Sequence, residues 1–262
     1  MNKVGTSLLQ ALEVDKNEIV ADLAVILGSG IKCTLSFVWS KTIDYSSIAG
    51  LPQINVEGHT GQVTFGQLSN GKKLLVFAGR FHLYEGYSVD DVQSIVKSIG
   101  YLGVKNVLIT NAAGGIDASL KVTDLMLITG IKDYQCDGNL FEERGLLNCL
   151  IKEKTSINTP LTNNLRTSRL KEGTYAAVLG PNYETESEIN LFRMQKCSAV
   201  GMSTNLEVQY CLENNLNVAA ISVITNSWFS KSIPTHQEVI QNSQLAQNKF
   251  DNLLSDLVQN ID

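Results

Sequence analysis

The stretch "GRFHLYEGY", residues 79–87, brings together a guanidinium, an imidazole, a phenol and a carboxylate: Arg80, His82, Tyr84 and Glu85. It comes directly after the apolar run "KLLVFAG". Surface loops consist mostly of Gly, Ser, Asn and Asp, so these four side chains indicate a functional site at the end of a buried strand. The structural alternative is that Arg80 and Glu85 pair with each other or with solvent, since such ion pairs are common and contribute little stability.

The few histidines of the chain favour hydrogen bonding over metal ligation. His59, His82 and His236 each lie beside a glycine-rich turn or a helix-start signal. None belongs to a His-x-x-x-His pair or a carboxylate-rich cluster, as zinc ligands do. This pattern favours contacts with an anion or a sugar, and we expect no metal site.

Glycine-rich turns are further candidates for binding an anion. "GSGIKC" (28–33) contains the G-x-G of a dinucleotide-binding fingerprint, but Cys33 occupies the third glycine position and no acidic residue is well placed on a following strand. A Gly-Ser-Gly turn can still wrap a single phosphate with backbone N–H groups. "TNAAGG" (110–115) would let backbone amides approach an anion, and "GMSTNLE" (201–207) puts Ser203 and Thr204 at a predicted helix N-terminus, another natural anion position. Taken singly, each is also compatible with a plain turn or a helix cap.

Five continuous apolar runs predict the strands that position these groups. They end abruptly in Gly or polar residues and span 23–30, 73–80, 104–115, 175–184 and 217–226. Apolar runs that do not alternate are typical of strands buried on both faces. In such sheets, ligands bind beyond the carboxyl ends of the strands. Polar residues follow the runs at that place: Ser29, Arg80, Asn111, Glu184 and Asn226. This agreement favours a site over the structural alternative.

Helix-start signals lie between the apolar runs. "SVDD" at 88 begins an apolar-periodic segment that we expect to end at Gly100, and "TESE" at 185, "TNLE" at 204 and "THQE" at 235 each match a capping box. The last predicts one long helix with an apolar face that runs to Val258. The alternation predicts the α/β class: a single domain over residues 1–262, with a mixed, mainly parallel central β-sheet flanked by α-helices.

Composition excludes several classes of protein. The 262 residues are 44% hydrophobic, enough for one large domain. A net charge of -5 gives no indication of nucleic-acid binding or of a basic membrane-binding surface. No apolar stretch approaches the roughly 20 residues of a membrane span, and residues 1–20 contain no signal-peptide core. Five cysteines without a C-x-x-C pair argue against zinc or disulfide frameworks, so we expect a cytoplasmic protein.

Several stretches of the chain together resemble one family. They are "VILGSG", "GHTGQVTFGQL", "GRFHLYEGYS", "VLITNAAGGI", "YAAVLGPNYETESEI", "AVGMSTNLEV" and "AAISVITN". These stretches, which lie between about Val25 and His236, are similar to the purine nucleoside phosphorylases of the trimeric class, whose close relative is 5′-methylthioadenosine phosphorylase. The resemblance implies phosphorolysis: a purine (2′-deoxy)ribonucleoside and phosphate give a free purine and a pentose 1-phosphate. It also implies purine salvage, a homotrimer, and inorganic phosphate as a co-substrate with no cofactor.

The resemblance assigns roles to individual residues. Positions that match the family's phosphate site are Ser29, His59, Arg80, His82, Ser203 and the backbone N–H of Ala112. Positions that match its ribose contacts are Tyr84, Met202 and His236, and those that match its purine pocket are Tyr183, Glu184 and Asn226. Glu85 is expected to orient the phosphate-binding turn. The residues that we expect to carry catalysis are Arg80, His82, Glu184 and Asn226.

These residue types suit the implied chemistry. Cleavage of the glycosidic bond develops positive charge on the ribose, which a phosphate dianion stabilises, and negative charge on the purine, which an amide at N7 stabilises. Arg80 offers phosphate a bidentate fork. The Glu184 carboxylate can accept N1–H of guanine or hypoxanthine and Asn226 can donate to O6, which predicts a preference for inosine and guanosine. The alternatives are a methylthioadenosine phosphorylase, a hydrolase that uses water, and a non-catalytic nucleoside-binding protein; the complete set of phosphate positions argues against the last two.

Two segments depart from the family pattern. The chain is shorter than typical members between Asp133 and Tyr175, and it lacks the family segment that lies near the subunit contact. The stretch between Asn226 and His236, "SWFSKSIPT", is shorter than the mobile gate of relatives. Both departures bear on the trimer contact and on gating, whereas the phosphate and purine positions are intact.

Overall fold

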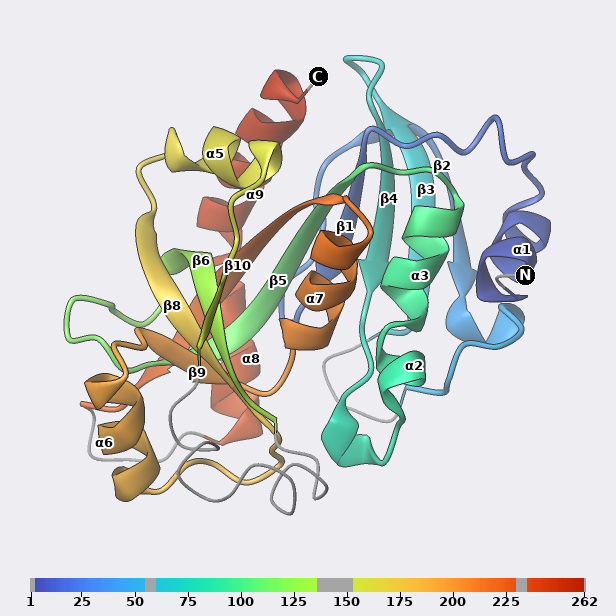
Figure 1. Cartoon of the computed structure of the whole chain (residues 1–262). Coiled ribbons are helices and arrows are strands. Elements are labelled where there is room, and N and C mark those ends of the chain that lie inside the picture. The colour runs from blue at the N-terminus through green and yellow to red at the C-terminus, as the bar shows by residue number, and fades with distance from the viewer. Residues whose placement is uncertain (1–2, 55–59, 136–152, 230–234, 262) are drawn as a thin grey trace.

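A mixed β-sheet forms the centre of the molecule in the residues that the structure describes, which are 3–54, 60–135, 153–229 and 235–261 (Figure 1). The structure is a computed structural model. The strands are β1 (Leu23–Leu27), β2 (Phe37–Asp44), β3 (Gln62–Leu68), β4 (Lys73–Ala78), β5 (Asn106–Gly115), β6 (Leu125–Tyr134), β7 (Lys154–Ser156), β8 (Lys171–Val178), β9 (Ala199–Gly201) and β10 (Asn217–Ser227). The five apolar runs of the sequence correspond to β1, β4, β5, β8 and β10, as predicted.

The strand order brings the carboxyl ends of several strands to one edge of the sheet. From β5 the sheet extends through β1, β4 and β3 to β2. On the other side, β10, β6, β8 and β9 lead back to β5, so these five strands close into a ring. The pairings of β1 with β4, of β1 with β5 and of β5 with β10 are all parallel. Their carboxyl ends therefore lie together, where ligands bind in sheets of this kind.

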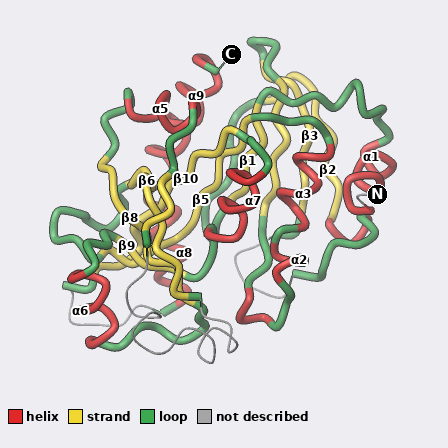
Figure 2. The backbone as a smooth tube through the Cα atoms, in the orientation of Figure 1, coloured by secondary structure: helices red, strands yellow, loops and turns green. Residues whose placement is uncertain are grey.

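Helices cover both faces of the sheet (Figures 1 and 2). They are α1 (Lys3–Leu12), α2 (Val89–Val92), α3 (Ser94–Tyr101), α5 (Pro160–Arg166), α6 (Glu186–Met194), α7 (Asn205–Glu213), α8 (His236–Leu245) and α9 (Gln247–Asn260). Ile26 of β1 belongs to an apolar cluster with Ile99 of α3, whereas the adjacent Val25 belongs to another with Phe250 of α9. The strand is thus buried on both faces, which explains its unbroken apolar sequence. None of the described helices is long and apolar enough to cross a membrane.

Two helix predictions are wrong in their extent. The long helix expected after residue 235 is interrupted at Ala246, where α8 ends and α9 begins, although the backbone of Ala246 stays in the right-handed helical region (φ -84°, ψ -7°). The segment that starts at Ser88 does not end at Gly100. Gly100 lies inside α3, and the glycine that adopts the left-handed conformation is Gly103 (φ +82°), the position that glycine favours after a helix.

Candidate active site

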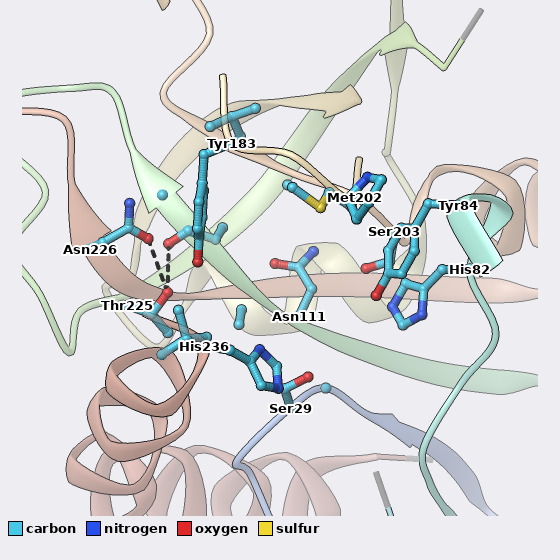
Figure 3. Close-up of a pocket in the computed structure, with 18 of the residues that line it drawn as sticks. Ser29, His82, Tyr84, Asn111, Tyr183, Met202, Ser203, Thr225, Asn226 and His236 are labelled. Carbon is cyan, nitrogen blue, oxygen red and sulfur yellow. Dashed lines mark hydrogen bonds between the residues drawn. The ribbon is translucent and has the colours of Figure 1, made fainter. Parts of the chain in front are cut away.

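A cavity of about 350 Å³ lies at the carboxyl ends of the central strands. All predicted site residues within the described ranges line it: Ser29, Arg80, His82, Tyr84, Ala112, Tyr183, Glu184, Met202, Ser203, Asn226 and His236. His59 lies outside the described residues. Figure 3 shows Tyr183 and Asn226 at one end of the cavity and His82 and Ser203 at the other. Among the described residues, no three His, Cys, Asp or Glu side chains are grouped as metal ligands would be.

Close approaches of the backbone shape the cavity. A Cβ atom on Gly28 would lie 2.8 Å from Cα of Asn111, so glycine is required where the turn after β1 packs against β5. A Cβ atom on Gly114 would lie 3.0 Å from Nδ2 of Asn226. The register between β5 and β10 shifts between Ile224 and Asn226. Such irregularities re-aim side chains next to functional sites, and here the shift falls at the predicted purine-binding amide.

Arg80, which follows β4, is buried and held on two sides. Its side chain is only 2% exposed, and its Nε lies 3.1 Å from Oε1 of the equally buried Glu207, although the N–H is not aligned for a hydrogen bond. Its Nη1 donates to the hydroxyls of Ser203 (3.2 Å) and Thr204 (3.4 Å). Its Nη2 is buried and has no hydrogen-bond partner among the described residues. A guanidinium donor in this condition, on a side chain that lines a cavity, suits an anionic ligand.

Glu85 does not pair with Arg80, so the structural alternative for this stretch is wrong. Its carboxylate accepts a hydrogen bond from the His82 N–H at 3.0 Å and lies 2.8 Å from His82 Nδ1. The imidazole also stacks on Tyr84, with 4.8 Å between ring centroids and 18° between planes. Burial, and to a smaller extent the Glu85 carboxylate, raises the pKa of Tyr84 to about 12. Glu85 therefore fixes the orientation of His82, and Tyr84 faces the cavity as a neutral phenol.

The opposite end of the cavity carries an oriented amide and a carboxyl group. The Thr225 hydroxyl lies 3.2 Å from Oδ1 of Asn226 and 3.4 Å from the carbonyl oxygen of Ala113 (Figure 3). Burial raises the pKa of Glu184 to about 7; a hydrogen bond from its own backbone opposes the rise, and the nearby Glu188 carboxylate adds to it. Perturbed groups of this kind in a cleft are typical of functional sites.

The sequence does not single out two residues of this network, Glu207 and Thr225. Glu207 belongs to "TNLE", whose spacing predicts a capping box before α7, and that prediction is wrong because Thr204 makes no side-chain cap bond. The Thr204 hydroxyl instead accepts a hydrogen bond from Nδ2 of Asn111 at 2.8 Å. Thr225 does carry a signal in the sequence, since it immediately precedes Asn226 at the end of an apolar run.

The family model of the phosphorylase superfamily matches residues 22–259. The chain therefore belongs to the phosphorylase superfamily, and it is an enzyme that acts as a pentosyltransferase. Its relatives over the whole length include purine nucleoside phosphorylase 1 of Geobacillus stearothermophilus, which is 33% identical over 100% of this chain and 99% of its own. The purine nucleoside phosphorylase of Rattus norvegicus is 34% identical over 91% of this chain and 89% of its own.

Solved structures agree with the sequence relatives. Schistosoma mansoni purine nucleoside phosphorylase in complex with adenosine has a TM-score of 0.79 to this chain at 28% identity. The match covers 99% of this chain and 96% of the Schistosoma chain. The complex of the same enzyme with inosine has a TM-score of 0.78 at 29% identity, over 99% and 95%. The α/β fold class and the resemblance to purine nucleoside phosphorylases are confirmed.

Proposed function

We propose that the protein catalyses the phosphorolysis of purine ribonucleosides and 2′-deoxyribonucleosides in purine salvage, with a preference for inosine and guanosine. The C1′–N9 bond breaks, a phosphate oxygen bonds to C1′, and the purine leaves with the bonding electron pair and takes up a proton. The observation that carries the proposal is the buried Nη2 of Arg80, without a partner among the described residues, on a side chain that lines the cavity. The cavity volume of about 350 Å³ falls within the range of small-molecule sites, about 300–1,000 Å³.

Phosphate binds, in this proposal, at the end of the cavity that carries Arg80. The guanidinium donates from Nη2, and the other donors are Ser29, His59, His82, Ser203 and the backbone N–H of Ala112. A dianion held there stabilises the positive charge that develops on the ribose. Because the chain as a whole has a net charge of -5, attraction of phosphate depends on this local group of donors. Inorganic phosphate is the co-substrate, and no cofactor is needed.

The nucleoside occupies the remainder of the cavity. Tyr84, Met202 and His236 contact the ribose, and Tyr183, Glu184 and Asn226 contact the purine. With its Oδ1 next to the Thr225 hydroxyl, Asn226 offers Nδ2 to the purine. This amide donor stabilises the negative charge of the leaving base. Bringing phosphate and nucleoside into line supplies most of the remaining rate enhancement, because the reaction needs no covalent nucleophile.

The preference for 6-oxopurines depends on Glu184 and Asn226. An ionised carboxylate accepts N1–H of hypoxanthine or guanine, whereas N1 of adenine is itself an acceptor. The structural relatives do not distinguish the bases, since the Schistosoma enzyme has been solved in complex with adenosine, with guanosine and with inosine. The side chains of this site are therefore the basis for the preference.

Release of free base from inosine, guanosine, adenosine and 5′-methylthioadenosine, each with and without phosphate, tests the proposal. We expect phosphate-dependent cleavage of inosine and guanosine, with much weaker activity on the two adenine nucleosides. Cleavage without phosphate would identify a hydrolase, and comparable or better use of methylthioadenosine would identify that class of phosphorylase. Binding without turnover would identify a nucleoside-binding protein. By the same resemblance we expect a cytoplasmic homotrimer, which light scattering of the purified protein tests.

A further inference from the structure

The capping-box pattern has a different outcome before α7 than before three other helices of the chain. Before α2, α6 and α8 the pattern forms reciprocal cap bonds, in the pairs Ser88 and Asp91, Thr185 and Glu188, and Thr235 and Glu238. Before α7, Thr204 and Glu207 have the same spacing, but Thr204 makes no side-chain cap bond. Both side chains turn to Arg80 instead. Local sequence therefore does not explain their conformation, and Arg80 does.

The contacts fix the direction of the guanidinium. Glu207 lies against Nε, and Thr204, together with Ser203, accepts from Nη1. A guanidinium is planar and rigid, so holding Nε and Nη1 determines where Nη2 points. Nη2 is the nitrogen without a hydrogen-bond partner among the described residues. Arg80 lines the cavity, whereas Thr204 and Glu207 are not among the residues that line it.

The backbone at this place adopts an uncommon conformation. Thr204 has φ +76°, which is a rare value for a β-branched residue and persists where the surroundings over-determine it. Its hydroxyl is bound on both sides, by Arg80 and by Nδ2 of Asn111. Glu207 lies in the first turn of α7, where the helix dipole favours a carboxylate. Thr204 is 1% exposed and Glu207 is 2% exposed, so solvent does not substitute for these contacts.

We propose that Glu207 and Thr204 are positioning residues that hold Arg80 with Nη2 directed at the phosphate. The inference rests on the proposed phosphorolysis and assigns to it two residues that do not touch the substrates. Glu207 supplies the counter-charge that keeps the guanidinium in place between turnovers. The Thr204 hydroxyl accepts a hydrogen bond from Arg80 and does not cap α7. The consequence is specific to phosphate, because the nucleoside end of the cavity is formed by other residues.

Steady-state kinetics of Glu207→Ala and Glu207→Gln test this role. We expect the KM for phosphate, at saturating inosine, to rise about 10–100-fold in Glu207→Ala, by analogy with the loss of a residue that orients a metal ligand. The KM for inosine, at saturating phosphate, should remain that of the wild type. Glu207→Gln keeps the shape of the side chain and an oxygen next to Nε, so its rise should be smaller. Thr204→Ala should move the KM for phosphate in the same direction.

Thr162→Val is the matched control for loss of a buried polar contact. Thr162 is fully buried and its hydroxyl binds the carbonyl of Val218, at the start of β10 and away from the cavity. We expect it to lower the melting temperature and leave the KM for phosphate unchanged. If the Glu207 and Thr204 variants behave like this control, their role is structural and the inference is overturned. A lower KM for phosphate in Glu207→Gln would also overturn it, because Glu207 would then compete with the anion.

The wild type separates this inference from the proposed function. If the wild type cleaves inosine without phosphate, the proposed function fails. If it requires phosphate and the variants keep its KM for phosphate, only the positioning role fails. Should Glu207→Ala not fold, Glu207→Gln and Thr204→Ala still decide the question. The rise in melting temperature that phosphate causes gives a second readout, and it should be smaller in every Glu207 and Thr204 variant.

Discussion

Replacement of Glu184 by Gln should stabilise the folded protein at high pH and impair the use of inosine. Burial raises the pKa of this carboxyl from 4.5 to about 7, so the folded state holds its proton over a range in which the unfolded state has lost it. Stability therefore falls as pH rises between these two values. The shift corresponds to about 3 kcal/mol at 1.36 kcal/mol per pKa unit. This is an upper limit, because the side chain is only partly buried.

Thermal unfolding between pH 4 and pH 8.5 measures the effect. Below pH 4.5 the wild type and Glu184→Gln should melt together, since the carboxyl is protonated in both states of the wild type. Above pH 7 the variant should melt at a higher temperature, by up to about 10 °C at the 2–4 °C per kcal/mol typical of a chain of this size. Glu186→Gln, an exposed carboxylate two positions further along, is the control and should melt like the wild type throughout. A difference between wild type and Glu184→Gln that is the same at pH 5 and pH 8 would refute the reasoning.

The same group should govern the pH dependence of catalysis. An ionised Glu184 is needed to accept N1–H of a 6-oxopurine, so kcat/KM for inosine should rise as pH increases through about 7. Glu184→Gln replaces a hydrogen bond to a charged carboxylate, worth about 1.5–3 kcal/mol, with one to a neutral amide oxygen, worth about 0.5–1.5 kcal/mol. The difference of about 1–1.5 kcal/mol corresponds to about 5–10-fold in kcat/KM. The variant should also lose the rise near pH 7. A wild-type profile that is flat from pH 6 to pH 8 would mean that the ionisation of Glu184 does not control binding of the purine.

Three further substitutions test the other parts of the site. Arg80→Ala should lower stability by about 3–5 kcal/mol, because it leaves the buried Glu207 carboxylate without its counter-charge, and phosphate should no longer raise the melting temperature; a variant as stable as the wild type would contradict this. Asn226→Asp should raise the ratio of kcat/KM for adenosine to that for inosine, because a carboxylate can accept N6–H; an unchanged ratio would show that Asn226 does not discriminate. Tyr84→Phe should raise the KM for inosine and not that for phosphate, and the opposite result would assign Tyr84 to the anion.

Much of the fold could be predicted because its central strands are buried on both faces. β1 and β10 have no exposed residue over most of their length, and a continuous apolar run that ends in glycine or a polar residue is typical of such strands. β2 could not be predicted in this way. Its residues are partly or fully exposed, so its hydrophobic pattern carries no signal. It forms because β3 offers an edge with which it pairs in antiparallel register.

The site residues also differ in whether the sequence carries a signal for them. Arg80 and Asn226, which line the cavity, follow strand ends and lie in family motifs, so they could be found from the sequence. The residues that orient them could not, because their signal is local and their partner is distant. "TNLE" at 204 has the spacing of the boxes that do cap α6 and α8, and nothing within it identifies an arginine 124 positions away. The cost of burying Arg80 decides between the two outcomes: an unpaired buried charge costs several kcal/mol, whereas a helix cap contributes about 1 kcal/mol. Thr204 and Glu207 could either cap α7 or pair with Arg80, and pairing with the buried charge is the more stabilising alternative. A capping pattern next to a functional motif should therefore be tested for a buried partner before it is interpreted as a cap.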